Sequence, residues 1–145
     1  MIGKMDTQKY GMVFHHLGYA THSISSSIKM FLNMGYEVSG TTFMDRSQGI
    51  AGVFLTGGGP KIELLESLPD EETLKPWLRN GPRFYHMAYE VDNIKIAAGF
   101  SKTYSGKIVS PPVSSVAFSG RQICFIMFRG NFLVELIEKR RSGGQ

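Results

Sequence analysis

The stretch FYHMAYEV, residues 84–91, repeats the setting of an earlier stretch, HHLGYAT at 15–21. In each stretch a histidine lies two positions before a small residue, within an apolar and aromatic segment typical of a β-strand. Two further segments place a glutamate between aliphatic residues, KIELLES at 61–67 and FLVELIEK at 132–139. The chain therefore carries four unusual polar residues in the order His, Glu, His, Glu, namely His16, Glu63, His86 and Glu135.

The spacing of these residues indicates an internal duplication. Glu63 follows His16 by 47 residues, and Glu135 follows His86 by 49 residues. A separation that nearly repeats is expected when one structural unit of about half the chain has been duplicated. We therefore expect both halves to contain the same series of elements.

Apolar periodicity and turn residues support that expectation. In the first half they predict a strand, a helix and three strands over 13–21, 24–34, 36–43, 49–56 and 60–67. In the second half they predict the same order over 84–92, 93–104, 107–110, 121–128 and 131–138. We predict an α+β fold in a single domain over 1–145, with βαβββ modules at 12–67 and 83–138 joined by a short helix at 70–79.

The two glutamates lie in strands that are apolar enough to be covered on both faces. A buried carboxylate without compensation costs several kcal/mol, and the usual remedies are an ion pair or a metal ion. Two neutral imidazoles and two carboxylates around a divalent cation would be formally neutral. The sequence therefore predicts a metal site formed by His16, Glu63, His86 and Glu135, and mixed nitrogen and oxygen ligands suit Zn, Co, Ni, Fe or Mn.

Composition excludes several other classes of protein. The 145 residues are 42% hydrophobic with a net charge of +4, which is typical of a globular chain. No apolar run approaches the roughly 20 residues of a membrane helix, and we expect neither membrane nor nucleic-acid binding. Cys124 is the only cysteine, so an internal disulfide is impossible and a reducing cytoplasm is the expected location.

Two neighbouring segments resemble those of a known protein superfamily. The stretches KIELLESLPDEETLKPWL at 61–78 and GPRFYHMAYEVDNI at 81–94 resemble the vicinal oxygen chelate superfamily, most closely its methylmalonyl-CoA epimerases. The four-ligand set is also similar to that of glyoxalase I. The resemblance implies paired βαβββ modules that form a curved mixed sheet around a metal-binding cleft, with ligands from the first and last strand of each module.

The resemblance also implies a reaction class. We expect an isomerase or lyase that abstracts a proton next to a metal-bound carbonyl or acyl thioester, with Glu135 as the principal base and Glu63 as its counterpart. It further implies a homodimer. Two alternatives are a binding protein that sequesters a small molecule without turnover and a metal-dependent dioxygenase. Binding proteins of this superfamily generally lack the metal ligands, and its dioxygenases usually use two histidines and one glutamate.

Substrate contacts are harder to predict from the sequence. Arg121, at the start of the strand before the Glu135 strand, is the best candidate to bind an anionic group on a substrate. Gln48 precedes Gly49 in a segment that could line the cleft, although a loop glutamine is more often solvated. His15 faces away from His16 by strand alternation, and His22 suits a local hydrogen bond. Cys124, in the apolar segment ICFIMF, is expected to pack as an inert thiol.

Overall fold

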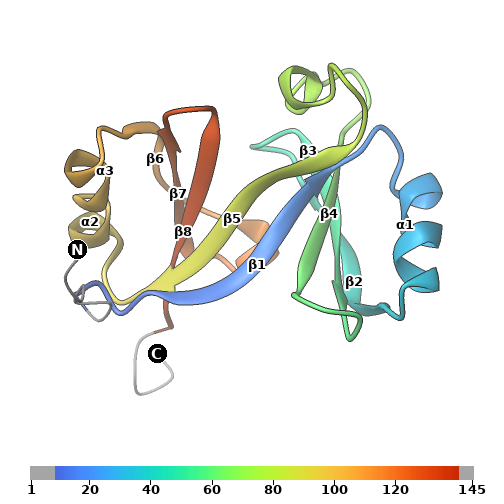
Figure 1. Ribbon diagram of the computed structural model, residues 1–145, viewed down its shortest axis with the longest axis horizontal. Coiled ribbons are helices and arrows are strands. Elements are labelled where there is room, and N and C mark those ends of the chain that lie inside the picture. Colours follow the sequence, from blue (N-terminus) through green and yellow to red (C-terminus); the bar gives the residue numbers. More distant parts are fainter. Residues whose placement is uncertain (1–8, 141–145) are drawn as a thin grey trace, which may run out of the picture. The chain divides into compact units, whose positions relative to one another are not determined.

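A computed structural model of the chain describes residues 9–140 and contains a mixed sheet of eight strands in the order β2-β3-β4-β1-β5-β8-β7-β6 (Figure 1). The strands are β1 (Val13–Ala20), β2 (Glu37–Asp45), β3 (Ile50–Thr56), β4 (Ile62–Ser67), β5 (Arg83–Val91), β6 (Lys107–Ser114), β7 (Gln122–Phe128) and β8 (Phe132–Glu138). The helices are α1 (Ile24–Asn33), α2 (Ile94–Ala97) and α3 (Phe100–Thr103), with 3₁₀ turns η1 (Lys75–Trp77) and η2 (Val116–Phe118). The predicted α+β class and the predicted order of strands and helices are confirmed.

The described residues form two compact units. The first unit contains 16–87 and 115–120, and the second contains 9–15, 88–114 and 121–140. Each unit has its own hydrophobic core and its own helices.

In the first unit, α1 covers one face of the sheet formed by β1 to β4. β1 pairs in parallel with β4, whereas β3 pairs antiparallel with both β2 and β4. α1 lies beside β4 (Figure 1), and Tyr19 packs edge to face against Phe31 with ring centroids 5.0 Å apart. Because side chains alternate along a strand, His16 and Glu63 point to the face opposite this helix.

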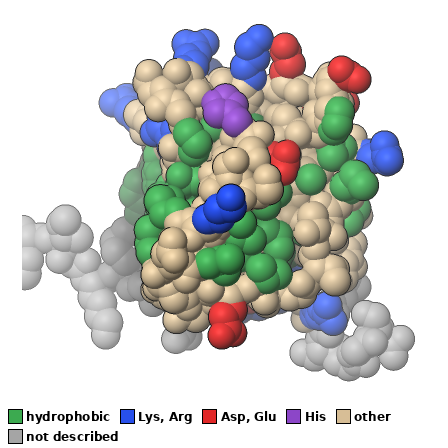
Figure 2. Space-filling model, turned by 90° about the vertical axis from the view of Figure 1, so that its right-hand side faces the viewer, with side chains coloured by type: hydrophobic (Ala, Val, Ile, Leu, Met, Phe, Trp, Pro, Cys, Tyr) green, Lys and Arg blue, Asp and Glu red, His purple; other side chains and the backbone are tan. Residues whose placement is uncertain are grey.

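Two residues, Ser23 and Gly35, set the ends of α1. The Ser23 side chain caps the helix by accepting a hydrogen bond from the backbone N–H of Ser26. Gly35, with a φ of 97°, ends the helix in a backbone conformation that few other residues adopt. The outer surface of this side is partly apolar, with Met30, Met34 and Val38 exposed, and Figure 2 shows hydrophobic side chains gathered there.

In the second unit, the predicted helix over 93–104 is split into two short helices that lie beside β6, β7 and β8. Asn93 caps the start of α2 by accepting a hydrogen bond from the N–H of Ile96. The Gly99 N–H then donates to the Ile96 carbonyl, and the Lys102 N–H donates to the Gly99 carbonyl. These three-residue contacts are of the 3₁₀ type, and glycine is a poor helix former, so the α-helix is interrupted at Gly99.

The predicted connecting helix over 70–79 is wrong except for one turn, η1 at Lys75–Trp77. Asp70 has a φ of 66°, which belongs to the left-handed region and prevents a helix from starting there. Pro76 has no N–H to donate within a longer helix. The acidic residues before it therefore form turns and do not form the first turn of an α-helix.

Among residues 9–140, no helix has the length and apolar character that would be needed to cross a lipid bilayer.

Candidate metal centre

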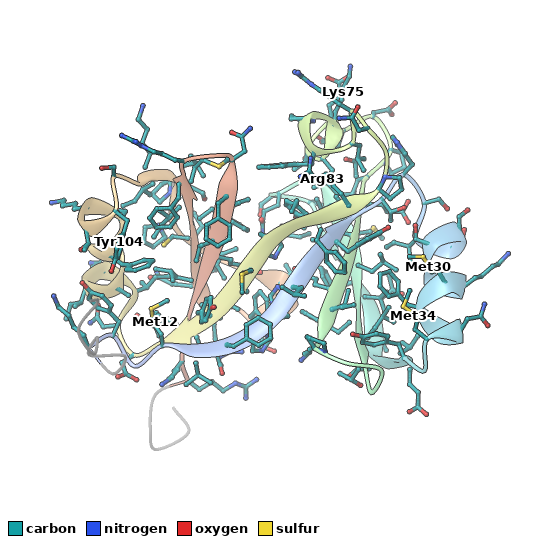
Figure 3. The ribbon with its side chains drawn as sticks, in the orientation of Figure 1. Met12, Met30, Met34, Lys75, Arg83 and Tyr104 are labelled. Carbon is teal, nitrogen blue, oxygen red and sulfur yellow. The ribbon has the colours of Figure 1, made fainter. Side chains whose placement is uncertain are left out.

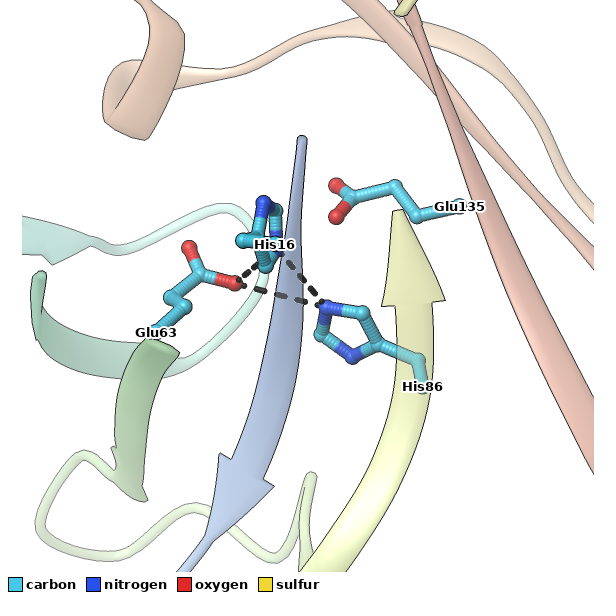
Figure 4. Close-up of side chains that lie close together, drawn as sticks. All are labelled: His16, Glu63, His86 and Glu135. Atoms are coloured by element: carbon cyan, nitrogen blue, oxygen red, sulfur yellow. Dashed lines mark hydrogen bonds and ion pairs between the residues drawn. The ribbon is translucent and has the colours of Figure 1, made fainter. Parts of the chain in front are cut away.

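Three side-chain atoms that could act as metal ligands converge in the interior of the first unit, each from a different strand. Nε2 of His16 on β1 lies 3.1 Å from Oε1 of Glu63 on β4. Nε2 of His86 on β5 lies 3.1 Å from Nε2 of His16 and 3.5 Å from the same Glu63 oxygen. Figure 4 shows these three contacts as dashed lines. The three residues are almost completely buried, with exposed fractions of 0%, 3% and 4% for His16, Glu63 and His86.

Strand register and one glycine produce this convergence. The parallel pairing of β1 with β4 places Glu63 beside Gly18, two positions along the same face from His16. A Cβ atom on Gly18 would overlap the imidazole of His86, so the ring occupies the space left by the absent side chain. The space beside Gly18 is therefore filled by a histidine from a different strand.

Hydrogen bonding by neutral side chains does not account for all three contacts. A neutral imidazole bears one N–H, and an ionised carboxylate bears none. The two Nε2 atoms can therefore carry at most two protons, while the triangle has three short edges. A cation at the centre would contact all three atoms through their lone pairs. Four ligands at the Zn–N distance of about 2.0–2.1 Å in a tetrahedron are separated by about 3.3 Å, and the observed separations of 3.1–3.5 Å fit that requirement.

The Glu63 carboxylate is stabilised in its charged form. Burial by itself would raise its pKa, but the charges and hydrogen bonds of His16 and His86 lower the pKa from 4.5 to about 2. Glu63 is therefore ionised at neutral pH, as a metal ligand must be.

Aromatic rings enclose His16, and this enclosure was not predicted from the sequence. Phe118 of η2 stacks on the His16 imidazole with a centroid distance of 5.7 Å, and Phe54 of β3 meets it edge to face at 5.6 Å. Tyr85 packs against His86 at 4.5 Å. Phe118 lies about a hundred residues from His16 in sequence, and no local pattern in the segment VAFS indicated that it would approach the site.

Glu135 is the fourth predicted ligand and lies on β8, where its side chain is 2% exposed. Among residues 9–140, one group of His, Cys, Asp and Glu side chains could hold a metal ion. It consists of His16, Glu63, His86 and Glu135, with one ligand atom of each within 4.8 Å of the others (Figure 4).

The profile of one protein superfamily matches most of the sequence. Residues 15–125 match the profile of the Glyoxalase/Bleomycin resistance protein/Dioxygenase superfamily. The chain belongs to this superfamily. The membership predicted from the sequence is thereby confirmed.

Individual proteins are similar to this chain in sequence or in structure. A mitochondrial methylmalonyl-CoA epimerase of Dictyostelium discoideum is 27% identical over 144 residues, covering 96% of this chain and 83% of its own. A hypothetical protein from Bacillus halodurans C-125 has a similar structure, with a TM-score of 0.77, 26% identity and coverage of 93% and 99%. The Mycobacterium tuberculosis methylmalonyl-CoA epimerase gives a TM-score of 0.75 at 20% identity, covering 95% of this chain and 94% of that one. The predicted resemblance to methylmalonyl-CoA epimerases is thus confirmed as a resemblance.

Gln48 and Arg121, which were predicted to bind substrate, each interact with an acidic side chain of this chain. The Gln48 side chain donates a hydrogen bond from Nε2 to Asp45 at 2.7 Å, and its backbone N–H donates to the same carboxylate. In the second unit, Arg121 pairs with Glu90 at 2.7 Å. A substrate role for either residue stays a prediction.

Three residues were predicted to have no catalytic or ligand role, namely His15, His22 and Cys124. His15 is half-buried and belongs to the second unit, and His22 is exposed. Cys124 is fully buried, as expected for a packed thiol. Asp45 is a buried acid that the sequence pattern did not single out, because aspartate is common in turns and its burial arises from the packing of Ser47 and Gln48 around it.

Proposed function

We propose that His16, Glu63, His86 and Glu135 bind one divalent metal ion and that the chain is an isomerase or lyase of the epimerase and glyoxalase type. The observation that carries the proposal is the buried triangle of ligand atoms from His16, Glu63 and His86. Two imidazoles and two carboxylates suit Zn, Co, Ni, Fe or Mn.

The two glutamates receive different roles in this proposal. A bound divalent ion would supply Lewis-acid stabilisation of negative charge on a substrate oxygen. One oxygen of Glu63 lies within 3.1–3.5 Å of both imidazole nitrogens, which makes this glutamate a suitable fixed ligand. We therefore assign proton transfer to Glu135, whose carboxylate would take a proton from the carbon next to a carbonyl or thioester and later return it.

We infer the substrate class from the proteins that this chain resembles. Several of these proteins are methylmalonyl-CoA epimerases, and the structure of one such epimerase contains methylmalonyl-CoA. We propose an acyl thioester with an acidic C–H as the substrate. Return of the proton to the opposite face of the same carbon would give epimerisation, whereas delivery to a neighbouring carbon would give the glyoxalase type of isomerisation.

The first test is the metal content of untagged protein, measured by elemental analysis for the wild type and for His86→Ala. We expect near-stoichiometric metal in the wild type and its loss in the variant, because His86 supplies one of the three converging atoms. Absence of metal from the wild type, even after reconstitution with each candidate ion, would overturn the metal site and favour a binding protein without turnover.

The second test is exchange of the acidic substrate C–H with deuterium from solvent, followed by mass spectrometry on methylmalonyl-CoA with the metal-loaded protein. Metal-dependent exchange together with epimerisation supports the assignment. A metal-loaded protein that catalyses no exchange but consumes oxygen with an aromatic diol would favour the dioxygenase alternative.

We further propose that the chain forms a homodimer in the cytoplasm, as the resemblance implies. The single, buried thiol of Cys124 is compatible with a reducing compartment. Sedimentation equilibrium should give twice the mass of the chain, and a single-chain mass at micromolar concentration would overturn the dimer.

A further inference from the structure

A cavity lies in the second unit, lined by residues of that unit alone. It has a volume of about 680 Å³, within the range of small-molecule pockets. Its walls are mostly aromatic and aliphatic, with one charged residue: Met12, Tyr89, Phe100, Tyr104, Phe128, Arg129, Phe132 and Val134. Met12, just before β1, and Tyr104, just after α3, are labelled in Figure 3.

The cavity is on the opposite face of β8 from Glu135. Phe132 and Val134 line it, and side chains alternate along the strand, so Glu135 points to the other face. Val134 and Leu136 pack with residues of α2 and with Cys124 in the core of this unit. The cavity is therefore separate from the carboxylate that we assign to the metal site.

Charge distinguishes this cavity from an ordinary gap in the core. Arg129 is exposed in the turn between β7 and β8 and contributes to the cavity wall. Within 9–140 no carboxylate pairs with it, whereas Arg121 at the other end of β7 pairs with Glu90. A guanidinium at the edge of an apolar cavity offers a planar pair of donors to a carboxylate.

We propose that this cavity binds an apolar monocarboxylic acid, with its hydrocarbon or aromatic part among the rings and its carboxylate at Arg129. The apolar walls provide the burial that such a chain requires, and the arginine selects an anionic head group over a neutral one. This site does not depend on the proposed metal chemistry.

The test is titration of the full chain with decanoate and, separately, with decanol, observed by NMR of methionine methyl groups labelled with ¹³C. The Met12 methyl should shift saturably, because Met12 lines the cavity. The methyls of Met30 and Met34, exposed on the α1 side, report non-specific binding to apolar surface and should not move. We expect decanoate to bind about three to five times more tightly than decanol, the strength of an exposed ion pair.

Variants separate the two parts of the site. Arg129→Gln should weaken decanoate about threefold to fivefold and leave decanol unchanged. Lys95→Gln, which removes an equal charge from the exposed surface of α2, should change neither. Tyr104→Ala, at a side chain that is 46% exposed, should weaken both ligands without unfolding the chain.

Three results would overturn the proposal. They are the absence of a saturable shift at Met12, equal shifts at Met30 and Met34, and equal loss of decanoate binding in the Arg129 and Lys95 variants. Failure of the metal proposal would alter none of these readouts, because they require neither metal nor turnover.

Discussion

The imidazole of His86 occupies the space left by the missing side chain of Gly18. A Cβ atom at position 18 would overlap the ring, and the backbone of Gly18 has no positive φ, so the glycine is required by space and not by backbone conformation. Glu63 lies beside Gly18 in the register of β1 and β4. One small residue thus allows an imidazole and a carboxylate from two other strands to meet His16.

Gly18→Ala should displace the His86 ring and weaken metal binding. Overpacking of a tight interior costs about 1–3 kcal/mol of unfolding free energy. Metal content and thermal unfolding would be measured beside Gly99→Ala, a control glycine with negative φ in the other unit. Full metal content in Gly18→Ala would contradict the spatial requirement.

Glu135→Gln should retain the fold and much of the metal but lose turnover. The amide cannot accept the substrate proton, and a general base contributes about 10²–10⁴-fold to rate. The assay is deuterium exchange on methylmalonyl-CoA, with Glu72→Gln at an exposed position as the matched control. If activity survives in Glu135→Gln, the base lies elsewhere.

Asp45→Asn should destabilise the first unit at neutral pH. Burial acts to raise the pKa of Asp45, but hydrogen bonds from Ser47 and Gln48 lower it below its ordinary value of 3.8. Loss of these charge-assisted bonds costs about 1–3 kcal/mol.

The pH dependence of the same variant gives an independent check. A lowered pKa in the folded state means that the charged form stabilises the fold above about pH 4, and that this contribution is lost as pH falls through the folded pKa. Urea unfolding from pH 7 to pH 3 should therefore show a gap between wild type and Asp45→Asn that narrows on acidification. A gap that widens below pH 4 would refute the assignment.

The thiol of Cys124 should be unreactive in the folded chain. Burial, with a smaller contribution from the charge of Glu135, raises its pKa to about 11, and the thiolate is the reactive form. Ellman's reagent at pH 8 should modify Cys124 only after unfolding in urea. Rapid modification of the native protein would show that the β7 core opens readily.

Much of the fold follows from local patterns. Apolar periodicity and turn residues were sufficient to predict β1, α1 and the strands that follow. Helix lengths were less accurate because they depended on single backbone positions. Gly99 divides one predicted helix, and Asp70 with Pro76 reduces another to a single turn.

For the candidate site, the sequence determined the residue types and their order: His16, Glu63, His86 and Glu135 were recognisable because charged and imidazole groups are costly in strands that are otherwise apolar. Only the tertiary structure determines which other residues surround these four side chains. Phe118 stacks on His16, and Gly18 makes room for His86, because strand register and the return of the η2 segment bring together positions that are far apart in the chain. The partners of Gln48 and Arg121, which are Asp45 and Glu90, could not be predicted either. Packing in three dimensions selects a hydrogen-bond partner, and local sequence does not.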